Sequence, residues 1–178
     1  MSTEWAPPAL VLLGVAGAGK STVGRLVADS LGVALVETDD LVSHESGLSV
    51  AQLVVSQDPR LGDLQRRAGL AALAPGGVAA GAVVTLGASL PGDAEVAQAL
   101  AAARALGSRV VELVVDTAEI SRREGLNAPR SVALGAPRAL LTRMVRELRG
   151  VYAPFVDVSV DTVGVAPATL AGQVLAAL

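Results

Sequence analysis

The chain of 178 residues contains no cysteine, one histidine, one lysine and one each of tryptophan, tyrosine and phenylalanine. The lack of cysteine excludes disulfides, thiolate metal sites and a cysteine nucleophile. With His44 as the only histidine, neither a multi-histidine metal site nor a Ser-His hydrolase centre is expected. A net charge of -3 without long basic runs argues against nucleic acid as a partner.

Long uninterrupted apolar segments are also missing, although hydrophobic residues make up 52% of the chain. The longest uncharged run, residues 68–92, is broken by two proline-glycine turns into pieces too short to span a bilayer. The apolar segment 5–19 lacks the basic leader of a signal peptide and continues directly into a glycine-rich loop. We therefore expect a cytoplasmic protein without membrane contact, forming a single domain over residues 1–178.

The only lysine, Lys20, lies in Gly14-Val15-Ala16-Gly17-Ala18-Gly19-Lys20-Ser21, which matches the phosphate-binding pattern G-x-x-x-x-G-K-[ST]. Glycines allow backbone dihedrals that side chains forbid, so the N–H groups of such a loop can turn inward. The apolar segment 9–15 is typical of a buried strand, and the pattern over 20–31 predicts an amphipathic helix whose N-terminus attracts anions. A turn that only connects strand and helix is the alternative, but this flanking pattern favours a site for ATP with Mg²⁺.

Lys20 is expected to reach the β- and γ-phosphates, and the Ser21 hydroxyl is expected to ligate Mg²⁺. A lysine ammonium is a compact point charge that the planar arginine fork does not easily replace. The predicted ATP-binding residues of the loop are Gly17, Ala18, Gly19, Lys20, Ser21 and Thr22.

Strand-like and helical patterns alternate along the chain. This alternation predicts an α/β fold with three α/β/α layers around a five-stranded parallel sheet. Gly47 and Pro59 divide a helical stretch at 40–73, and the polar, proline-bearing segment 125–137 is a candidate lid. The expected strands are residues 9–15, 33–37, 82–86, 109–115 and 155–160. The other expected helices are residues 20–31, 93–106, 119–124, 138–151 and 168–178.

Acidic side chains follow the second expected strand. Glu37, Asp39 and Asp40 fall at the carboxyl edge of the sheet, where open α/β folds bind ligands. Asp39 or Asp40 can instead cap the next helix by accepting from its first N–H groups. Position alone leaves the catalytic and capping interpretations open.

Together these motifs resemble the shikimate kinase family of P-loop proteins, over nearly the whole chain. The resemblance implies a P-loop kinase fold with a lid. We also expect a monomer in the cytoplasm. The resemblance also implies an enzyme of aromatic amino acid biosynthesis that transfers the γ-phosphoryl group of ATP to a hydroxyl of shikimate. The matching segments are residues 17–22, 37–39, 47–50, 122–130, Tyr152 and 155–162.

The resemblance assigns roles to individual residues. Asp39 would hold the acceptor hydroxyl and help to deprotonate it, while Glu37 would act through water bound to Mg²⁺. Arg123 would flank the adenine, and Arg130 would enter from the lid to neutralise the transferred phosphoryl charge. These roles suit phosphoryl transfer, in which catalysis depends mainly on positioning the reactants and stabilising charge.

The acceptor side departs from the family. The arginines that hold the acceptor carboxylate in the family align with Gly62-Asp63 and with Leu148. Arg66 and Arg149 are therefore the predicted substitutes. Gly87-Ala88-Ser89 stands where the family has three glycines, with Gly87 as a predicted acceptor contact.

Three hypotheses remain open from the sequence. The chain is a shikimate kinase with a divergent acceptor site, which implies ATP and a small hydroxylated carboxylate as substrates. Alternatively, it is a kinase of the same build for another small polyol or sugar acid. The third hypothesis is a protein that binds nucleotide without catalysis.

Overall fold

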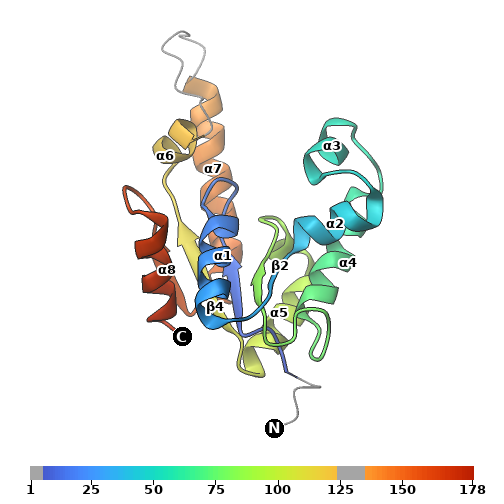
Figure 1. Cartoon of the computed structure of the whole chain (residues 1–178). Helices are drawn as coiled ribbons and strands as arrows, with labels where there is room; N and C mark the ends of the chain where they lie inside the picture. The colour runs from blue at the N-terminus through green and yellow to red at the C-terminus, as the bar shows by residue number, and fades with distance from the viewer. Residues whose placement is uncertain (1–5, 124–134) are drawn as a thin grey trace.

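The computed structural model describes residues 6–123 and 135–178, with the backbone alone for 123 and 135–138. Five strands form one parallel sheet in the order β2-β3-β1-β4-β5 (Figure 1). The predicted five-stranded parallel sheet is confirmed. The strands are β1 (Leu10–Leu13), β2 (Leu35–Glu37), β3 (Val83–Thr85), β4 (Arg109–Val114) and β5 (Val158–Asp161).

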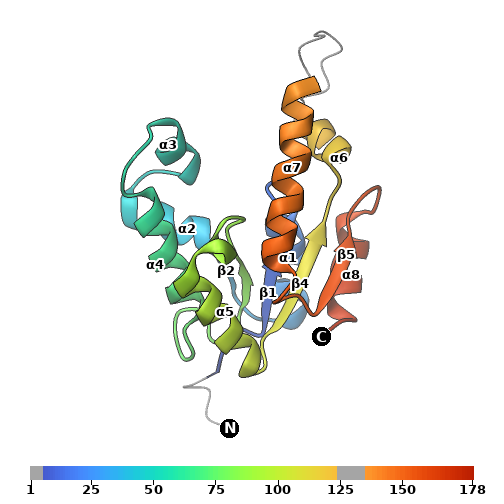
Figure 2. The same cartoon turned by 180° about the vertical axis from the view of Figure 1, so that it is seen from behind.

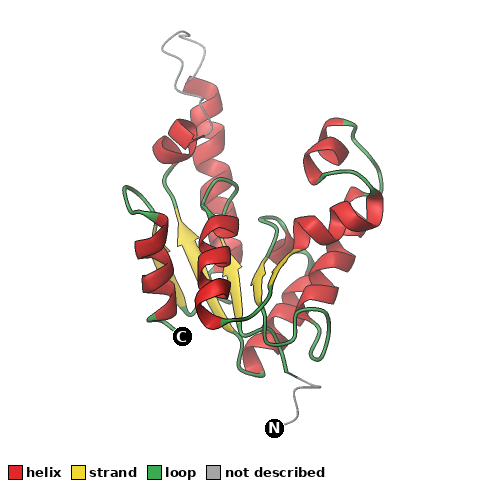
Figure 3. Ribbon diagram, in the orientation of Figure 1, coloured by secondary structure: helices red, strands yellow, loops and turns green. Residues whose placement is uncertain are grey.

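Helices cover both faces of the sheet, which confirms the three-layer arrangement. Helices α1 and α8 lie over the face seen in Figure 1, and α5 and α7 lie over the face seen in Figure 2. Helices α2, α3 and α4 extend beyond the β2 edge (Figure 3). No helix of the described ranges 6–123 and 135–178 is long and apolar enough to cross a membrane. The helices are α1 (Lys20–Leu31), α2 (Thr38–Ser46), α3 (Val50–Val55), α4 (Leu61–Leu73), the 3-10 helix η2 (Leu90–Gly92), α5 (Ala94–Ala105), α6 (Thr117–Arg123), α7 (Gly135–Tyr152) and α8 (Pro167–Leu175).

The helix boundaries follow local capping chemistry. Gly32 ends α1 in the left-handed conformation and donates its N–H to carbonyls of the last turn. Gly47 ends α2 in the same way. Ser49 and Gln52 form a reciprocal capping box that begins α3. These caps explain why the helical stretch breaks where glycine and serine occur.

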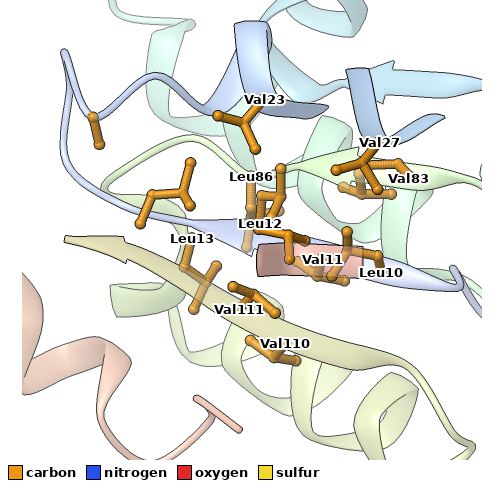
Figure 4. Packing of buried hydrophobic residues seen from close by; sticks show 14 of the residues in the cluster. Leu10, Val11, Leu12, Leu13, Val23, Val27, Val83, Leu86, Val110 and Val111 are labelled. Carbon is orange, nitrogen blue, oxygen red and sulfur yellow. The ribbon is translucent and has the colours of Figure 1, made fainter. Parts of the chain in front are cut away.

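Strand β1 is the centre of the hydrophobic core. All four of its residues are at most 1% exposed, because helices cover both of its faces (Figure 4). Val23 and Val27 of α1 pack against it from one side, and Val111 of β4 lies beside it. Burying a leucine or valine side chain contributes roughly 1.5–3 kcal/mol. The strand therefore gives the loop that follows it a rigid base.

Gly14 marks the closest approach of this loop to β4. Its φ is +153°, and a Cβ there would lie 2.8 Å from the backbone oxygen of Leu113. We expect Gly14→Ala to lower the free energy of unfolding by about 1–3 kcal/mol, because the backbone must shift. The matched control is Gly172→Ala in α8, where a Cβ meets nothing within 4 Å. In urea titrations Gly172→Ala should be neutral or stabilising, and equal midpoints for both variants would contradict the account.

Candidate active site

A cleft of about 1160 Å³ lies where β1, β2 and β3 end. It brings together residues that are far apart in the sequence. Lys20 and Ser21 reach it from the start of α1, Glu37 and Asp39 from the junction of β2 with α2, and Gly87 from the segment after β3. The predicted catalytic and metal-binding residues of the described chain thus share one cavity.

The phosphate loop adjoins a second cavity of about 580 Å³. Ala18 and Thr22 line it from the loop side, and Val165, Pro167 and Leu170 provide an apolar wall. Gly17 and Gly19, at the boundary of the two cavities, have φ values of +78° and +94°, which confirms the predicted need for glycine. An apolar slot beside a phosphate loop suits a nucleoside base.

The Lys20 ammonium folds back over the loop. Its Nζ donates to the carbonyl of Gly14 at 2.7 Å and to that of Val15 at 3.2 Å. Burial lowers the pKa of Lys20 to about 8, although the nearby carboxylates of Asp39 and Glu37 oppose the shift. A bound triphosphate adds negative charge beside Nζ and therefore favours the protonated form.

Asp39 carries a perturbed carboxyl group at the mouth of the cleft. Although the residue is exposed, desolvation by the surrounding walls raises its pKa; Lys20 opposes this shift, and Glu37 and Asp40 add to it. The capping interpretation of Asp39 and Asp40 is wrong. Helix α2 begins at Thr38 with Glu37 at the N-cap position, so both aspartates lie in the first turn, and no side chain caps the helix.

Thr38, which the sequence patterns did not single out, joins the two strand ends below the aspartate. It is 1% exposed, donates its Oγ1 to the carbonyl of Thr85 at 3.3 Å, and accepts from the N–H of Gly87 at 2.9 Å. Thr85 Oγ1 in turn donates to Glu37 Oε1 at 3.2 Å. The N–H of Gly87 is therefore engaged by Thr38, while the residue itself lines the cleft.

We expect Thr38→Val to reduce both stability and turnover. The variant keeps the shape of the side chain but removes the hydrogen bonds to the buried Thr85 carbonyl and from the partly buried Gly87 N–H. The free energy of unfolding should fall by about 1–3 kcal/mol. Urea titration and kcat are the two readouts. The control Thr169→Val, at an exposed position on α8, should change stability by less than about 0.5 kcal/mol; a similar loss in both would contradict the role of Thr38.

The residues present fit Mg²⁺ held mainly by a nucleotide. Magnesium prefers hard oxygen ligands and keeps several waters, so a protein needs to supply only one or two groups. Ser21 and Glu37 supply a hydroxyl and a carboxylate to the same cleft. Within residues 6–123 and 135–178 there is no cluster of three or more acidic or histidine side chains that would hold the ion alone.

The structure does not bring Arg149 to the cleft lining. Its Nε donates to Glu112 Oε1 of β4 at 2.9 Å, and Ser159 donates to the other oxygen of this buried carboxylate at 2.9 Å. A one-residue step rotates a helical side chain by about 100°. The ion pair and the fully buried Tyr152 hold α7 in a rotation in which Leu148, the neighbour of Arg149, lines the cleft instead.

Arg66 is likewise placed elsewhere. Its Nε donates to Asp93 Oδ2 at 2.9 Å, and Asp93 also caps α5 through its other oxygen. The cleft is lined by the preceding residue, Gln65. Arg123 ends α6, but its side chain is outside the described part, and Arg130 lies outside it altogether.

A family model for shikimate kinase matches residues 16–178. The chain belongs to the shikimate kinase family. This family member is 36% identical over 172 residues to the shikimate kinase of Streptomyces avermitilis. The aligned region spans 96% of this chain and 95% of that protein. The chain is 35% identical over 158 residues to the shikimate kinase of Thermobifida fusca. The aligned region spans 87% of this chain and 86% of that protein. The predicted resemblance is confirmed.

Solved structures support the same fold for this shikimate kinase family member. Shikimate kinase from Acinetobacter baumannii, in complex with shikimate, has a TM-score of 0.68 at 21% identity and covers 97% of this chain and 92% of that chain. A gluconokinase from Sinorhizobium meliloti has a TM-score of 0.62 at 22% identity and covers 96% of this chain and 91% of that chain. At such identities the similarity shows the P-loop kinase fold and not the substrate.

Proposed function

We propose that this shikimate kinase family member is an ATP-dependent phosphotransferase that acts on a hydroxyl of shikimate. The observation that carries the proposal is the meeting of Lys20 and Asp39 in one cleft, in a chain of this family. Relatives named shikimate kinase match it over nearly its full length. Lys20 supplies the charge for the phosphates, and Asp39 supplies a carboxylate for the acceptor hydroxyl.

The step is an in-line transfer between two oxygens. The acceptor oxygen forms a bond to the γ-phosphorus as the bond to the β–γ bridging oxygen breaks, and ADP leaves with that oxygen. The hydroxyl proton passes to the Asp39 carboxylate. A raised pKa makes Asp39 a stronger base for this proton than an ordinary aspartate. Lys20 offsets the charge that develops on the phosphoryl oxygens.

Several residues would support the step. Ser21 would ligate Mg²⁺ and Glu37 would hold its waters, and the ion would neutralise phosphate charge when bound. Arg123 would flank the adenine beside the apolar slot, and Arg130 would act from the lid.

We further propose that residues 1–178 form one kinase domain with a lid at 125–137, working as a monomer in the cytoplasm. Light scattering on the purified chain tests the monomer.

A second candidate is a kinase for another small polyol, with Asp39 again holding the hydroxyl. The specific observation in its favour is that no arginine is among the described residues lining the cleft. Nucleotide binding without catalysis is the remaining alternative.

ADP release measured with and without shikimate tests the proposal. Shikimate-dependent ADP release at millimolar acceptor supports it. If shikimate is inert while a panel of polyols is phosphorylated, the second candidate replaces the first. Tight binding of ATP with no turnover on any acceptor would favour the protein without catalysis.

A further inference from the structure

The acceptor half of the cleft is rich in negative charge. The acceptor half is defined as the cleft residues outside the phosphate loop and α1. They come from the end of β2, α2 to α4, the end of β3 and the segment after it, and α7. Among the described lining residues of the whole cleft, Lys20 is the only cation. Four carboxylates face the same space, those of Glu37, Asp39, Asp40 and Glu147. A carboxylate acceptor would meet like charges there, which disfavours its binding.

The two arginines predicted to replace the family's carboxylate-binding arginines are paired with carboxylates outside the cleft lining. Arg149 is paired with the buried Glu112 on the far side of α7. Arg66 is paired with Asp93 at the start of α5. Moving either guanidinium into the cleft would break its pair. For Arg149 it would leave the buried Glu112 carboxylate without its cation, although Ser159 would still donate to it, and an uncompensated buried charge is unfavourable. Neither predicted arginine therefore offers its guanidinium to a carboxylate in the cleft, and no arginine is among the described lining residues.

The remaining wall suits a molecule with hydroxyls and apolar edges. Val54, Leu148 and Val151 give an apolar surface on opposite sides of the acceptor half. Gln65 and Glu147 project polar groups into the same space, and a carboxylate accepts hydrogen bonds from hydroxyls. The only ion pair of the Glu147 carboxylate within the described chain is an exposed one with Arg143 at 3.7 Å, which leaves it able to accept from a ligand.

We infer that the acceptor half selects uncharged polyhydroxylated molecules over carboxylates, with Glu147 and Gln65 as its hydrogen-bonding side chains. The inference rests on the proposed kinase function and deepens it by naming the acceptor class. The chemical step is unchanged, because the bond to phosphorus forms at a hydroxyl oxygen and its proton passes to Asp39. Shikimate is then the poorer substrate when compared with a neutral molecule that carries the same hydroxyls.

The test compares shikimate with its primary amide, which keeps the ring and hydroxyls but lacks the charge. Dissociation constants are measured by calorimetry in the presence of a non-hydrolysable ATP analogue and Mg²⁺, and kcat/KM is measured with ATP. We expect the amide to bind at least about ten-fold more tightly, since one such factor corresponds to 1.4 kcal/mol. Tighter binding of shikimate, or equal binding, would overturn the inference whether or not turnover occurs.

Leu148→Arg sharpens this test by placing a cation in the acceptor half. The variant should raise the affinity for shikimate relative to the affinity for the amide by at least about ten-fold, because the new guanidinium offers a bidentate partner for the carboxylate. The control is Gly150→Arg, which adds the same charge on α7 at an exposed position where a Cβ meets nothing within 4 Å. An equal shift in both variants would contradict the assignment. Binding of both acceptors without any turnover would overturn the proposed kinase function alone.

Discussion

Lys20→Ala is expected to reduce kcat by about 10²–10³-fold or more and to weaken ATP binding. The ammonium is the only cation of the described cleft lining, and it lies over the loop carbonyls of Gly14 and Val15. Its removal takes away a positioned charge at the phosphoryl group, and one such donor typically contributes this much to the rate. Nucleotide titration and steady-state kinetics measure the two effects.

Lys20→Arg is the matched variant, since it keeps the charge but replaces a compact ammonium with a wide fork. It should recover part of the ATP affinity and little of kcat. The wild-type affinity for ATP should fall as pH rises above about 8, because Lys20 then loses its proton, and Lys20→Ala should lack this dependence. Near-normal turnover by Lys20→Ala would show that the loop does not position the transferred phosphoryl group.

Asp39→Asn is expected to reduce kcat by about 10²–10⁴-fold while leaving ATP affinity nearly unchanged. Asparagine has the size of aspartate but cannot take the hydroxyl proton, and a general base contributes a factor of this order. The pKa of Asp39 is raised above its ordinary value, so wild-type kcat/KM should fall as pH falls through that raised pKa. The sign follows because only the deprotonated carboxylate acts as base.

The acid limb of the pH profile should disappear in Asp39→Asn. Asp29→Asn, at an exposed position on α1 outside the cleft, serves as the control and should behave as wild type. Loss of ATP binding in Asp39→Asn, or an unchanged kcat, would argue against an acceptor role. A pH profile that Asp39→Asn leaves intact would assign the acid limb to another group.

The phosphate loop and the start of α1 were predictable because the residues that they require are adjacent in the sequence. Gly17 and Gly19 must adopt positive φ, Lys20 must follow them directly, and a buried strand must precede the loop, so a short stretch of sequence carries the information. The order of strands and helices was predictable for a similar reason. Glycine at 32 and 47 ends helices wherever the chain leaves the right-handed conformation.

The acceptor half could not be predicted from spacing alone. Whether Leu148 or Arg149 faces the cleft depends on the rotation of α7, and that rotation depends on contacts with distant segments, such as those with Glu112 and Ala88. The predicted location of Arg66 in the acceptor site is wrong for the same reason, because Asp93 at the start of α5 binds its guanidinium. The Thr38 contacts with Thr85 and Gly87 also join segments far apart in sequence. Each of these depends on tertiary packing.

The most direct measurement follows the γ-phosphoryl group itself. The chain is incubated with Mg²⁺ and ATP labelled in that group, together with shikimate or its amide, and the products are identified by mass spectrometry. We predict a labelled phosphomonoester of the acceptor, formed in equal amount to ADP and absent with Lys20→Ala. Label found only in inorganic phosphate, or only in unreacted ATP with every acceptor tried, would contradict the account.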